Sequence, residues 1–312
     1  MGYVVISLFD GISCGQIALQ KAGISVKRYY ASEISKTAIA ITQKNFPNTI
    51  QLGDVNNWKS WNIDLDPGDK LIILGGSPCQ GFSHSGKGLN FKDPRSKLFF
   101  TFVDILNHYK PAYWLLENVI MKDVWRDTIT QHLPGKPKPI FIDSAVIAPS
   151  MRKRNYWSNF LPATFTITPP KNTKSFSSYL DPSQDKSGRS WKPANIVGRK
   201  LDSKGVRKDH DPNIKITQVL TVRKNTELLN CLTTVQKDTI LSVHPPGTKY
   251  IDVYNTKTRG VDWRYLSAVE AERMLTIPDN YTELPKLAES SRHSHVGNAW
   301  TVDIIVELLK QI

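Results

Sequence analysis

Cys79, which follows Pro78, is the residue that most directly indicates nucleophilic chemistry in this sequence. The apolar run at 71–74 predicts a buried parallel strand, and Gly75 and Gly76 end it. The proline before the cysteine and the Gln-Gly pair after it predict a loop at the carboxyl end of that strand, where open α/β sheets bind their ligands. A cysteine there is either a small core residue or a nucleophile, and the loop favours the nucleophile.

Glu117 and two arginines are the other candidates for chemistry. Glu117 ends a short strand at 114–116, beside the predicted cysteine strand, and is a candidate general acid. Arg152 and Arg154 follow a predicted strand at 140–147. Because alternate side chains of an extended segment share a face, this spacing directs both guanidinium groups to one side, as an anion site requires.

The start of the chain predicts a second functional edge. A strand at 3–8 is followed by a glycine-bearing turn at 9–15 and a helix at 16–22, an order that lets backbone N–H groups approach a cofactor. A tight structural turn would explain the same residues. Glu33 ends the second strand, where a ribose diol is usually bound, and Asp54 ends the third. The alternatives are an exposed strand-end carboxylate for Glu33 and a turn former for Asp54.

The remaining pattern is that of an α/β protein with strands and helices in alternation. Helices are predicted at 36–45, 98–109, 267–276 and 301–311, and further strands at 26–31 and 216–222. Ser267 and Glu270 form a capping box at the start of one helix. The polar segment 83–94, with three glycines, is either a mobile lid over a substrate or a simple connection.

The positive charge is concentrated in one part of the chain. The 312 residues carry a net charge of +13, and residues 151–265 contain 21 Lys and Arg against nine Asp and Glu. The rest of the chain is nearly neutral. Prolines interrupt the same region, so residues 160–264 predict a small, irregular, basic second domain. Its charge indicates a phosphate-binding face rather than a merely solvated surface.

Composition limits the remaining possibilities. The three cysteines are far apart and odd in number, which indicates a reducing compartment and no disulfide framework or zinc cluster. No apolar run is long enough to cross a membrane, and the N-terminus opens directly into a strand without a signal-peptide pattern. We therefore expect a cytoplasmic enzyme with no membrane partner and no metal.

Taken in order, the motifs resemble those of the cytosine-C5 DNA methyltransferases over nearly the whole chain outside the basic insert. The motifs are Phe9-x-Gly11, Glu33, Gly53-Asp54-Val55, the run from Gly75 to Ser83, Glu117-Asn118-Val119, Arg152-x-Arg154 and Gly297-Asn298-Ala299. Segments 7–12, 30–33 and 154–157 are most similar to the de novo animal branch. The resemblance implies a Rossmann-like S-adenosylmethionine-dependent methyltransferase fold. Residues 1–159 plus 265–312 would form the catalytic and cofactor-binding domain, and 160–264 the target-recognition domain.

The resemblance also assigns roles to the catalytic residues. Cys79 would add as a thiolate to C6 of cytosine, and Glu117, in a protonated state that burial favours, would hydrogen-bond N3. Arg154, with Arg152 close by, would orient the ring through its O2. The activated C5 would then attack the methyl group of S-adenosylmethionine. Since C5 and C6 are unreachable inside a duplex, the base would be flipped out of double-stranded DNA.

Further residues are implied for the cofactor and for DNA. The cofactor positions are Phe9, Asp10, Gly11, Ile12, Ser13, Glu33, Ile34, Asp54, Val55, Pro78, Leu98, Asn298 and Trp300. The DNA-binding positions are Gln80, Ser83, Arg223, Lys224, Thr233, Thr234, Gln236 and Lys237. The resemblance further implies a monomer from a bacterial or phage-infected cell, associated with the nucleoid, with a possible restriction endonuclease partner.

The sequence departs from the family pattern in two places. Ser150 stands where the family has the glutamine of Gln-x-Arg-x-Arg, and Val235 stands where CpG-reading animal enzymes have an arginine. CpG specificity is therefore not carried over. Two rival functions are a tRNA cytosine methyltransferase and a catalytically silent DNA-binding relative. The first lacks support because its Cys-Phe-Thr signature is missing and the basic insert is larger than in that branch. The second would have lost Cys79 or Glu117, and both are present.

Overall fold

The computed structural model divides the chain into two compact units, which are described separately. The first unit contains Met1–Val146, Lys153–Pro169 and Ala299–Ile312, and the second contains Ile147–Arg152 and Pro170–Asn298. The structure describes residues 2–77, 97–171, 174–185, 188–202, 206–208, 210–222, 227–244, 250–252 and 261–312. Pro78, Cys79, Gln80, Ser83, Arg223, Lys224 and the whole predicted lid at 83–94 lie outside these ranges. No helix among the described residues is long and apolar enough to cross a membrane.

The first unit is a seven-stranded sheet in the order β3-β2-β1-β4-β5-β7-β6. Its strands are β1 (Tyr3–Leu8), β2 (Val26–Ser32), β3 (Ile50–Gln51), β4 (Lys70–Gly75), β5 (Tyr113–Val119), β6 (Ile140–Asp143) and β7 (Lys153–Ser158). The first five pair in parallel, whereas β7 lies antiparallel between β5 and β6. The chain moves from β1 through β2 to β3 in one direction across the sheet and then returns to form β4 on the other side of β1. The order of strands therefore reverses between β1 and β4. Ligands bind at such a point in open α/β sheets.

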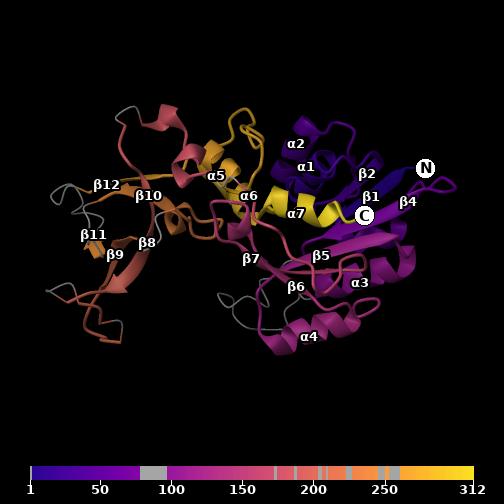
Figure 1. Cartoon of the computed structure of the whole chain (residues 1–312), viewed down its shortest axis with the longest axis horizontal. Helices are drawn as coiled ribbons and strands as arrows, with labels where there is room; N and C mark the ends of the chain where they lie inside the picture. The colour runs from indigo at the N-terminus through magenta and orange to yellow at the C-terminus, as the bar shows by residue number, and fades with distance from the viewer. Residues whose placement is uncertain are drawn as a thin grey trace. The chain divides into compact units, whose positions relative to one another are not determined.

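Helices cover both faces of this sheet (Figure 1). They are α1 (Cys14–Lys21), α2 (Lys36–Asn45), α3 (Lys97–Tyr109), α4 (Asp123–His132) and α7 (Val302–Leu309), with 3₁₀ turns η1 (Val55–Ser60) and η4 (Ser144–Val146). Figure 1 shows α1, α2 and α7 on one side and α3 and α4 on the other. Strands covered on both faces bury nearly every side chain, which explains the continuous apolar runs of β1 and β4.

The main core lies between the sheet and α3. Ile6 of β1, Ile73 of β4 and Trp157 of β7 pack there with Phe99 and Phe102 of α3. The one polar group of the buried Trp157 is satisfied, because its indole N–H donates to Thr130 Oγ1 at 2.8 Å. This core fixes the strands in register, so that Leu8 lies opposite both Ser32 and Gly75. The carboxyl ends of β1, β2 and β4 therefore lie level at one edge of the sheet.

The second unit is built on a five-stranded antiparallel sheet in the order β11-β9-β8-β10-β12. The strands are β8 (Lys192–Lys200), β9 (Ile216–Val222), β10 (Ile240–Val243), β11 (Tyr250–Asp252) and β12 (Asp262–Tyr265). Its other elements are α5 (Ala268–Met274), α6 (Glu289–Asn298) and the 3₁₀ turns η5 (Phe176–Tyr179), η6 (Pro182–Gln184) and η7 (Gln236–Asp238). A small apolar cluster of Ala194, Ile196, Leu220, Ile240 and Val261 holds the sheet together. The region predicted as irregular thus contains a regular sheet.

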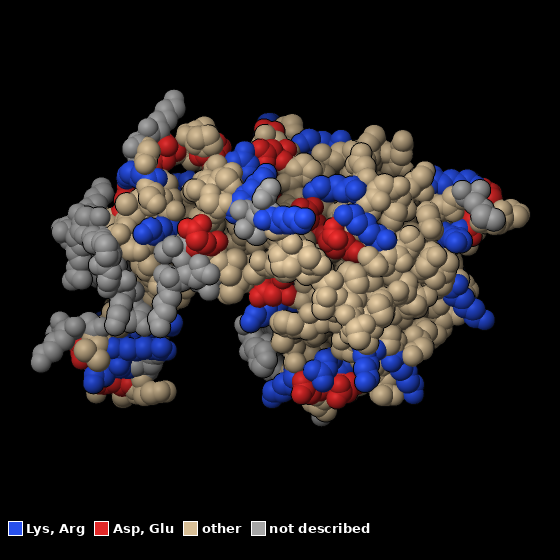
Figure 2. All heavy atoms as spheres, viewed as in Figure 1, with Lys and Arg blue, Asp and Glu red and all other residues tan. Residues whose placement is uncertain are grey.

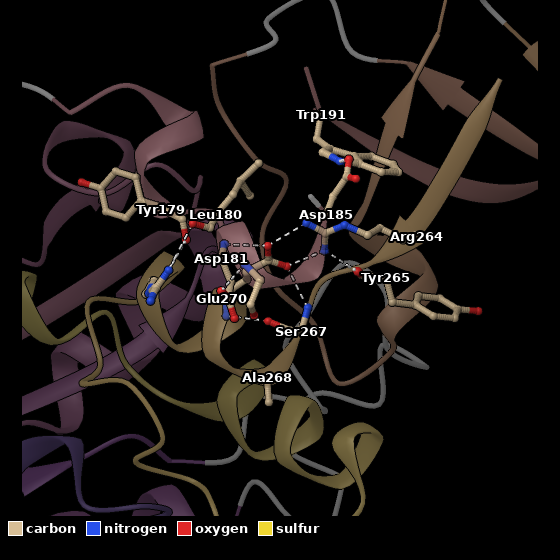
Figure 3. Close-up of polar contacts among 12 residues, drawn as sticks. Tyr179, Leu180, Asp181, Asp185, Trp191, Arg264, Tyr265, Ser267, Ala268 and Glu270 are labelled. Carbon is tan, nitrogen blue, oxygen red and sulfur yellow. Dashed lines mark hydrogen bonds and ion pairs between the residues drawn. The ribbon is translucent and has the colours of Figure 1, made fainter. Parts of the chain in front are cut away.

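Glu270 joins this sheet to helix α5 (Figure 3). Its carboxylate is fully buried and accepts two 2.7 Å hydrogen bonds from the guanidinium of Arg264, next to the end of β12. It also accepts from the backbone N–H groups of Ser267 and Asp181, and Ser267 caps the helix in return, so the predicted capping box is confirmed. Arg264 lies over the ring of Trp191 at 5.1 Å. These bonds explain why 265–298 pack with the second unit, whereas the sequence pattern predicts that they belong with 1–159.

Candidate active site

Glu117 is held by two donors at the carboxyl end of β5. Its carboxylate is buried, with 8% of the residue exposed. Arg154 Nε lies 2.7 Å from Oε1, and the indole N–H of Trp300 donates to Oε2 at 3.2 Å. The antiparallel pairing of β5 with β7 sets Arg154 opposite Val119, within reach of Glu117. The side chain is thus fixed in direction by a cation on one oxygen and a neutral donor on the other.

The backbone directly after β4 can approach the carboxylate of Glu117 closely because residue 76 is a glycine. A Cβ on Gly76 would lie 3.1 Å from Glu117 Oε2 and 3.0 Å from Trp300 Nε1. The next residue, Ser77, is buried, and its hydroxyl accepts from the side-chain amide of Asn118 at 3.1 Å. The last described residues before Cys79 are therefore bonded to the strand that carries Glu117.

The loop after β1 has an unusual backbone. Phe9, Gly11 and Ser13 have φ angles of 57°, 58° and 57°, in the left-handed region that residues with a Cβ rarely adopt. Asp10 supports this conformation by accepting hydrogen bonds from the hydroxyl of Ser13 and, at 2.8 Å, from the hydroxyl of Tyr29. Strained backbone that is held in this way is concentrated at functional sites.

Asp10 has a perturbed acidity. Burial raises its pKa from 3.8 to about 6, and the hydrogen bonds from Ser13, Ser7 and Tyr29 act in the opposite direction. The carboxylate is therefore mainly ionised at neutral pH and protonated in mild acid.

Glu33 links the first loop to the end of β2. Its Oε2 accepts from the backbone N–H of Gly11 at 2.8 Å, and its Oε1 accepts from the N–H groups of Ile34 and Ser35, also at 2.8 Å. Beside it the side chain of Ile34 is 73% exposed. A carboxylate held by backbone donors beside an exposed apolar side chain offers both polar and apolar contacts to a ligand.

The third strand end is bonded to the same place. The hydroxyl of Ser32 donates to the carbonyl of Gly53 at 2.8 Å. Asp54 then caps η1 by accepting from the N–H of Asn56 at 2.9 Å, as a turn former does, and Val55 is buried. The structure therefore brings together the predicted residues of loops 9–13, 33–34 and 54–55 at one sheet edge.

Comparison with known proteins identifies this arrangement. Residues 3–122 match the family described as C-5 cytosine-specific DNA methylase. The match includes the first loop, Glu33, Asp54 and Glu117, so the resemblance predicted from the sequence motifs is confirmed.

Bacterial type II methyltransferases are among the curated proteins that this chain is similar to. It is 37% identical over 119 residues to the type II methyltransferase M.NlaIV of Neisseria lactamica, a stretch that covers 36% of this chain and 27% of the relative. It is 41% identical over 117 residues to M.HaeII of Haemophilus aegyptius, covering 38% and 35%. The matched stretch thus spans about a third of the length of these relatives.

Solved structures of similar fold match the whole chain. A triple mutant of Spodoptera frugiperda DNMT2 has a TM-score of 0.67 at 20% identity and covers 100% of this chain and 99% of its own. The Entamoeba histolytica methyltransferase EhMeth has a TM-score of 0.68 at 20% identity, with 100% and 98% coverage. A putative DNA modification methyltransferase of an Escherichia coli prophage has 0.61 at 17%, with 100% and 98%. The predicted α/β methyltransferase fold is confirmed.

The other residues that were predicted to bind the cofactor differ in burial and in the unit to which they belong. Ile12 is buried in the first loop, and Leu98 is half-buried in α3 against the main core. Trp300 belongs to the first unit, through its bond to Glu117, whereas Asn298 is exposed at the end of α6 in the second unit. Among the residues that the structure describes, no group of three or more His, Cys, Asp or Glu side chains could hold a metal ion.

The predicted DNA-binding residues that are described form one turn of the second unit. Thr233 and Gln236 are half-buried, whereas Thr234 and Lys237 are exposed. The hydroxyl of Thr233 donates to Asp238 at 2.8 Å and accepts from the N–H of Val235 at 3.1 Å. On the face drawn in Figure 2, lysine and arginine side chains are spread over both units with acidic side chains among them.

The two arginines of Arg152-x-Arg154 have different partners. Arg152 is buried and donates from Nη1 to the carbonyls of Leu232 and Gly297, each at 3.2 Å, whereas Arg154 pairs with Glu117. Sequence reasoning also did not single out Tyr29, Gly76 or Ser77 for a role of their own. Gly76 and Ser77 lie in the motif that runs from Gly75 to Ser83, which could have indicated a role for them. Tyr29 lies in a strand and in no motif, so its sequence position gave no such indication.

Proposed function

We propose that this chain is a DNA cytosine-C5 methyltransferase that uses S-adenosylmethionine as methyl donor. The observation that carries the proposal is the fixed carboxylate of Glu117 at the end of β5, bonded to Arg154 and Trp300 and adjacent to the end of β4 that leads to Cys79. The family match over 3–122 and the type II methyltransferases among the relatives support DNA cytosine as the substrate.

The cofactor fits the loops of the first unit on three observations. The exposed Ile34 offers an apolar face for an adenine ring, Glu33 offers carboxylate oxygens beside it for ribose hydroxyls, and the left-handed loop 9–13 brings backbone close to the sheet edge. S-adenosylmethionine, when bound, supplies an electrophilic methyl group. Phe9 to Ser13 would hold its methionine part, and Val55 and Trp300 would complete the pocket walls of the first unit.

The reaction on the base would be carried by three side chains. The thiolate of Cys79 would form a covalent bond to C6 of cytosine, which makes C5 nucleophilic, and C5 would then take up the methyl group. Loss of the C5 proton would restore the C5–C6 double bond and release the thiolate. Glu117 would hydrogen-bond N3 and stabilise the charge that develops on the ring. Arg154 would keep Glu117 in that direction and orient the base through O2. A planar guanidinium is suited to both contacts because its donors have a fixed geometry.

The base has to leave the duplex before this chemistry is possible, since ring atoms C5 and C6 are stacked in the double helix. We assign recognition of the surrounding duplex to the second unit, with Thr233, Thr234, Gln236 and Lys237, together with Gln80, Ser83, Arg223 and Lys224. Double-stranded DNA would be the partner of a monomer, and a restriction endonuclease would accompany it, as the type II names of the relatives suggest.

The test is methyl transfer from labelled S-adenosylmethionine to duplex DNA, followed by bisulfite sequencing of the product. We expect 5-methylcytosine in DNA and none in a tRNA pool supplied under the same conditions. Cys79→Ser should abolish transfer while cofactor binding stays within a few-fold, and Cys14→Ala, in the buried start of α1, should keep activity. Transfer to tRNA alone, or transfer by Cys79→Ser at the wild-type rate, would contradict the proposal.

A further inference from the structure

The segment 149–152 is bonded to the base of the 231–235 turn. The N–H of Leu229 donates to the carbonyl of Pro149 at 2.8 Å, and the N–H of Met151 donates back to Leu229 at 3.0 Å. Between them the hydroxyl of Ser150 donates to the carbonyl of Met274, at the end of α5, at 2.8 Å. All of these residues belong to the second unit. The backbone that leads to Arg152 is therefore held by hydrogen bonds to Leu229 and, through the hydroxyl of Ser150, to Met274.

The guanidinium of Arg152 continues this connection to helix α6. Its Nη1 donates to the carbonyl of Leu232 and to the carbonyl of Gly297, both at 3.2 Å. The carbonyl of Gly297 lies in the last turn of α6, where carbonyls have no partner within the helix and where positive charge is stabilised. One buried cation therefore ties the turn to the end of the helix.

Gly297 makes the second contact between the turn and α6. A Cβ at this position would collide with the carbonyl of Thr233 and would lie 2.7 Å from the N–H nitrogen of Thr234. The close approach of the two backbones therefore requires glycine. One helical turn earlier, His293 is also buried, and burial lowers its pKa, although Glu289, the backbone of Thr233 and Asp238 act in the opposite direction. The turn thus packs on this face of α6.

The anchored turn presents its tip to solvent. Leu232 is fully buried, Thr233 is half-buried, and Thr234 and Val235 are exposed. The hydroxyl of Thr233 closes the turn by bonding Asp238 and Val235. A turn whose base is fixed to a helix and whose tip is exposed holds two side chains in a defined direction, as sequence recognition requires.

We propose that Arg152 is a positioning residue that, together with Gly297, anchors the 231–235 turn so that Thr234 and Val235 face the DNA next to the target cytosine. This inference rests on the proposed function for its ligand, but the anchoring itself does not. Arg152 acts through the turn and has no direct part in the bond changes at the base. Threonine and valine present methyl groups, which favour contact with the methyl group of thymine in the major groove.

The experiment combines hydrogen exchange with methylation across randomised flanking sequences. In Arg152→Lys we expect amides of the 231–238 peptide to exchange about tenfold faster, because a hydrogen-bonded anchor is lost. Discrimination between the best and worst flanking sequences should fall by about tenfold. The affinity for S-adenosylmethionine should stay within a few-fold. Gly297→Ala should produce the same pattern from the other side of the contact.

Two further variants keep the result decisive. Asp238→Asn weakens the bond to the Thr233 hydroxyl at a half-buried site, so it tests the turn even where Arg152→Lys or Gly297→Ala fails to fold. Arg126→Lys, on exposed α4, is the matched control and should change neither readout. A loss of kcat in Arg152→Lys with unchanged exchange of the turn would overturn the inference and make Arg152 a catalytic residue. A wild-type chain that methylates no DNA would remove the proposed function, while the exchange data would still decide the anchoring.

Discussion

Arg154 binds Glu117 through Nε at 2.7 Å, and this pair spans two neighbouring antiparallel strands. Both side chains are largely buried, with 13% and 11% of their side-chain areas exposed. A buried carboxylate that loses its cation keeps its desolvation cost without its partner, so the pair is sensitive to removal of either member. For the proposed reaction, the pair fixes the direction in which Glu117 meets a cytosine ring.

The first prediction concerns this pair. Glu117→Gln should lower kcat by about 10²–10⁴-fold, because the amide keeps the shape but is a much weaker acid. Arg154→Ala should lower the free energy of unfolding by about 2 kcal/mol, because one charged hydrogen bond to a buried carboxylate is lost. Steady-state kinetics and urea denaturation measure the two effects. Unchanged kcat in Glu117→Gln would show that another acid serves the base.

Glu117, Glu33 and the strands that carry them were predictable from the sequence. Buried parallel strands have continuous apolar runs, and their ends are marked by glycine or by a charged residue. The bond from Trp300 to Glu117 was not predictable, since it joins residues 183 positions apart. The tertiary fold alone brings them together.

Two helices and one sheet escaped prediction for local reasons. Helix α4 buries only Ile129 and has no side-chain cap, so its apolar signal is weak. Helix α6 buries Arg292 and His293, whose polar type predicts a surface position. Arg292 is buried because it bonds Glu272 of α5 and Thr282, which no pattern within α6 reveals. In the second unit the strand at 216–222 was predicted, but the other strands of the sheet mix polar and apolar residues and were not.

The second prediction concerns Gly76. An alanine Cβ there would force Glu117 or Trp300 to move by a few tenths of an ångström, since its distances to Glu117 Oε2 and Trp300 Nε1 would be shorter than an ordinary van der Waals contact. We expect Gly76→Ala to lower kcat by about tenfold or more, because small displacements of reacting groups cost much of the rate. Gly2→Ala, whose Cβ would meet Cβ of Lys27 at 3.3 Å and lies outside the candidate site, is the matched control. Equal activity of the two variants would place the reacting groups elsewhere.

The third prediction concerns the basic second domain. The excess of positive charge in residues 151–265 should make DNA affinity fall steeply with salt, since each phosphate contact releases condensed counterions. With four or more phosphate contacts we expect a slope of about −3.6 or steeper in a plot of log K against log salt concentration. Fluorescence anisotropy with a labelled duplex gives the slope. A slope near zero would mean that this charge serves solubility and not binding.

The fourth prediction concerns Asp10 and pH. Its folded pKa of about 6 lies above the usual 3.8, so between these values the folded chain binds more protons than the unfolded chain. Stability should therefore fall as pH rises from about 4 to about 6, and above that range the ionised side chain costs roughly 3 kcal/mol. Asp10→Asn should remove this cost and be more stable than the wild type at neutral pH, by an amount reduced by any weakening of the bonds to Ser13 and Tyr29.

Urea denaturation of wild type and Asp10→Asn across this pH range measures the difference directly. The gain in the variant should grow as pH rises from about 4 to about 6, level off above that range and vanish toward about pH 3, where the wild-type carboxyl is protonated in both states. Asp123→Asn, on the exposed start of α4, should stay within about 0.5 kcal/mol of the wild type throughout. A constant difference between Asp10→Asn and wild type would mean that burial does not perturb this carboxyl. The hydrogen bonds of Asp10 would then hold the strained loop without a free-energy cost for ionising a buried carboxyl group.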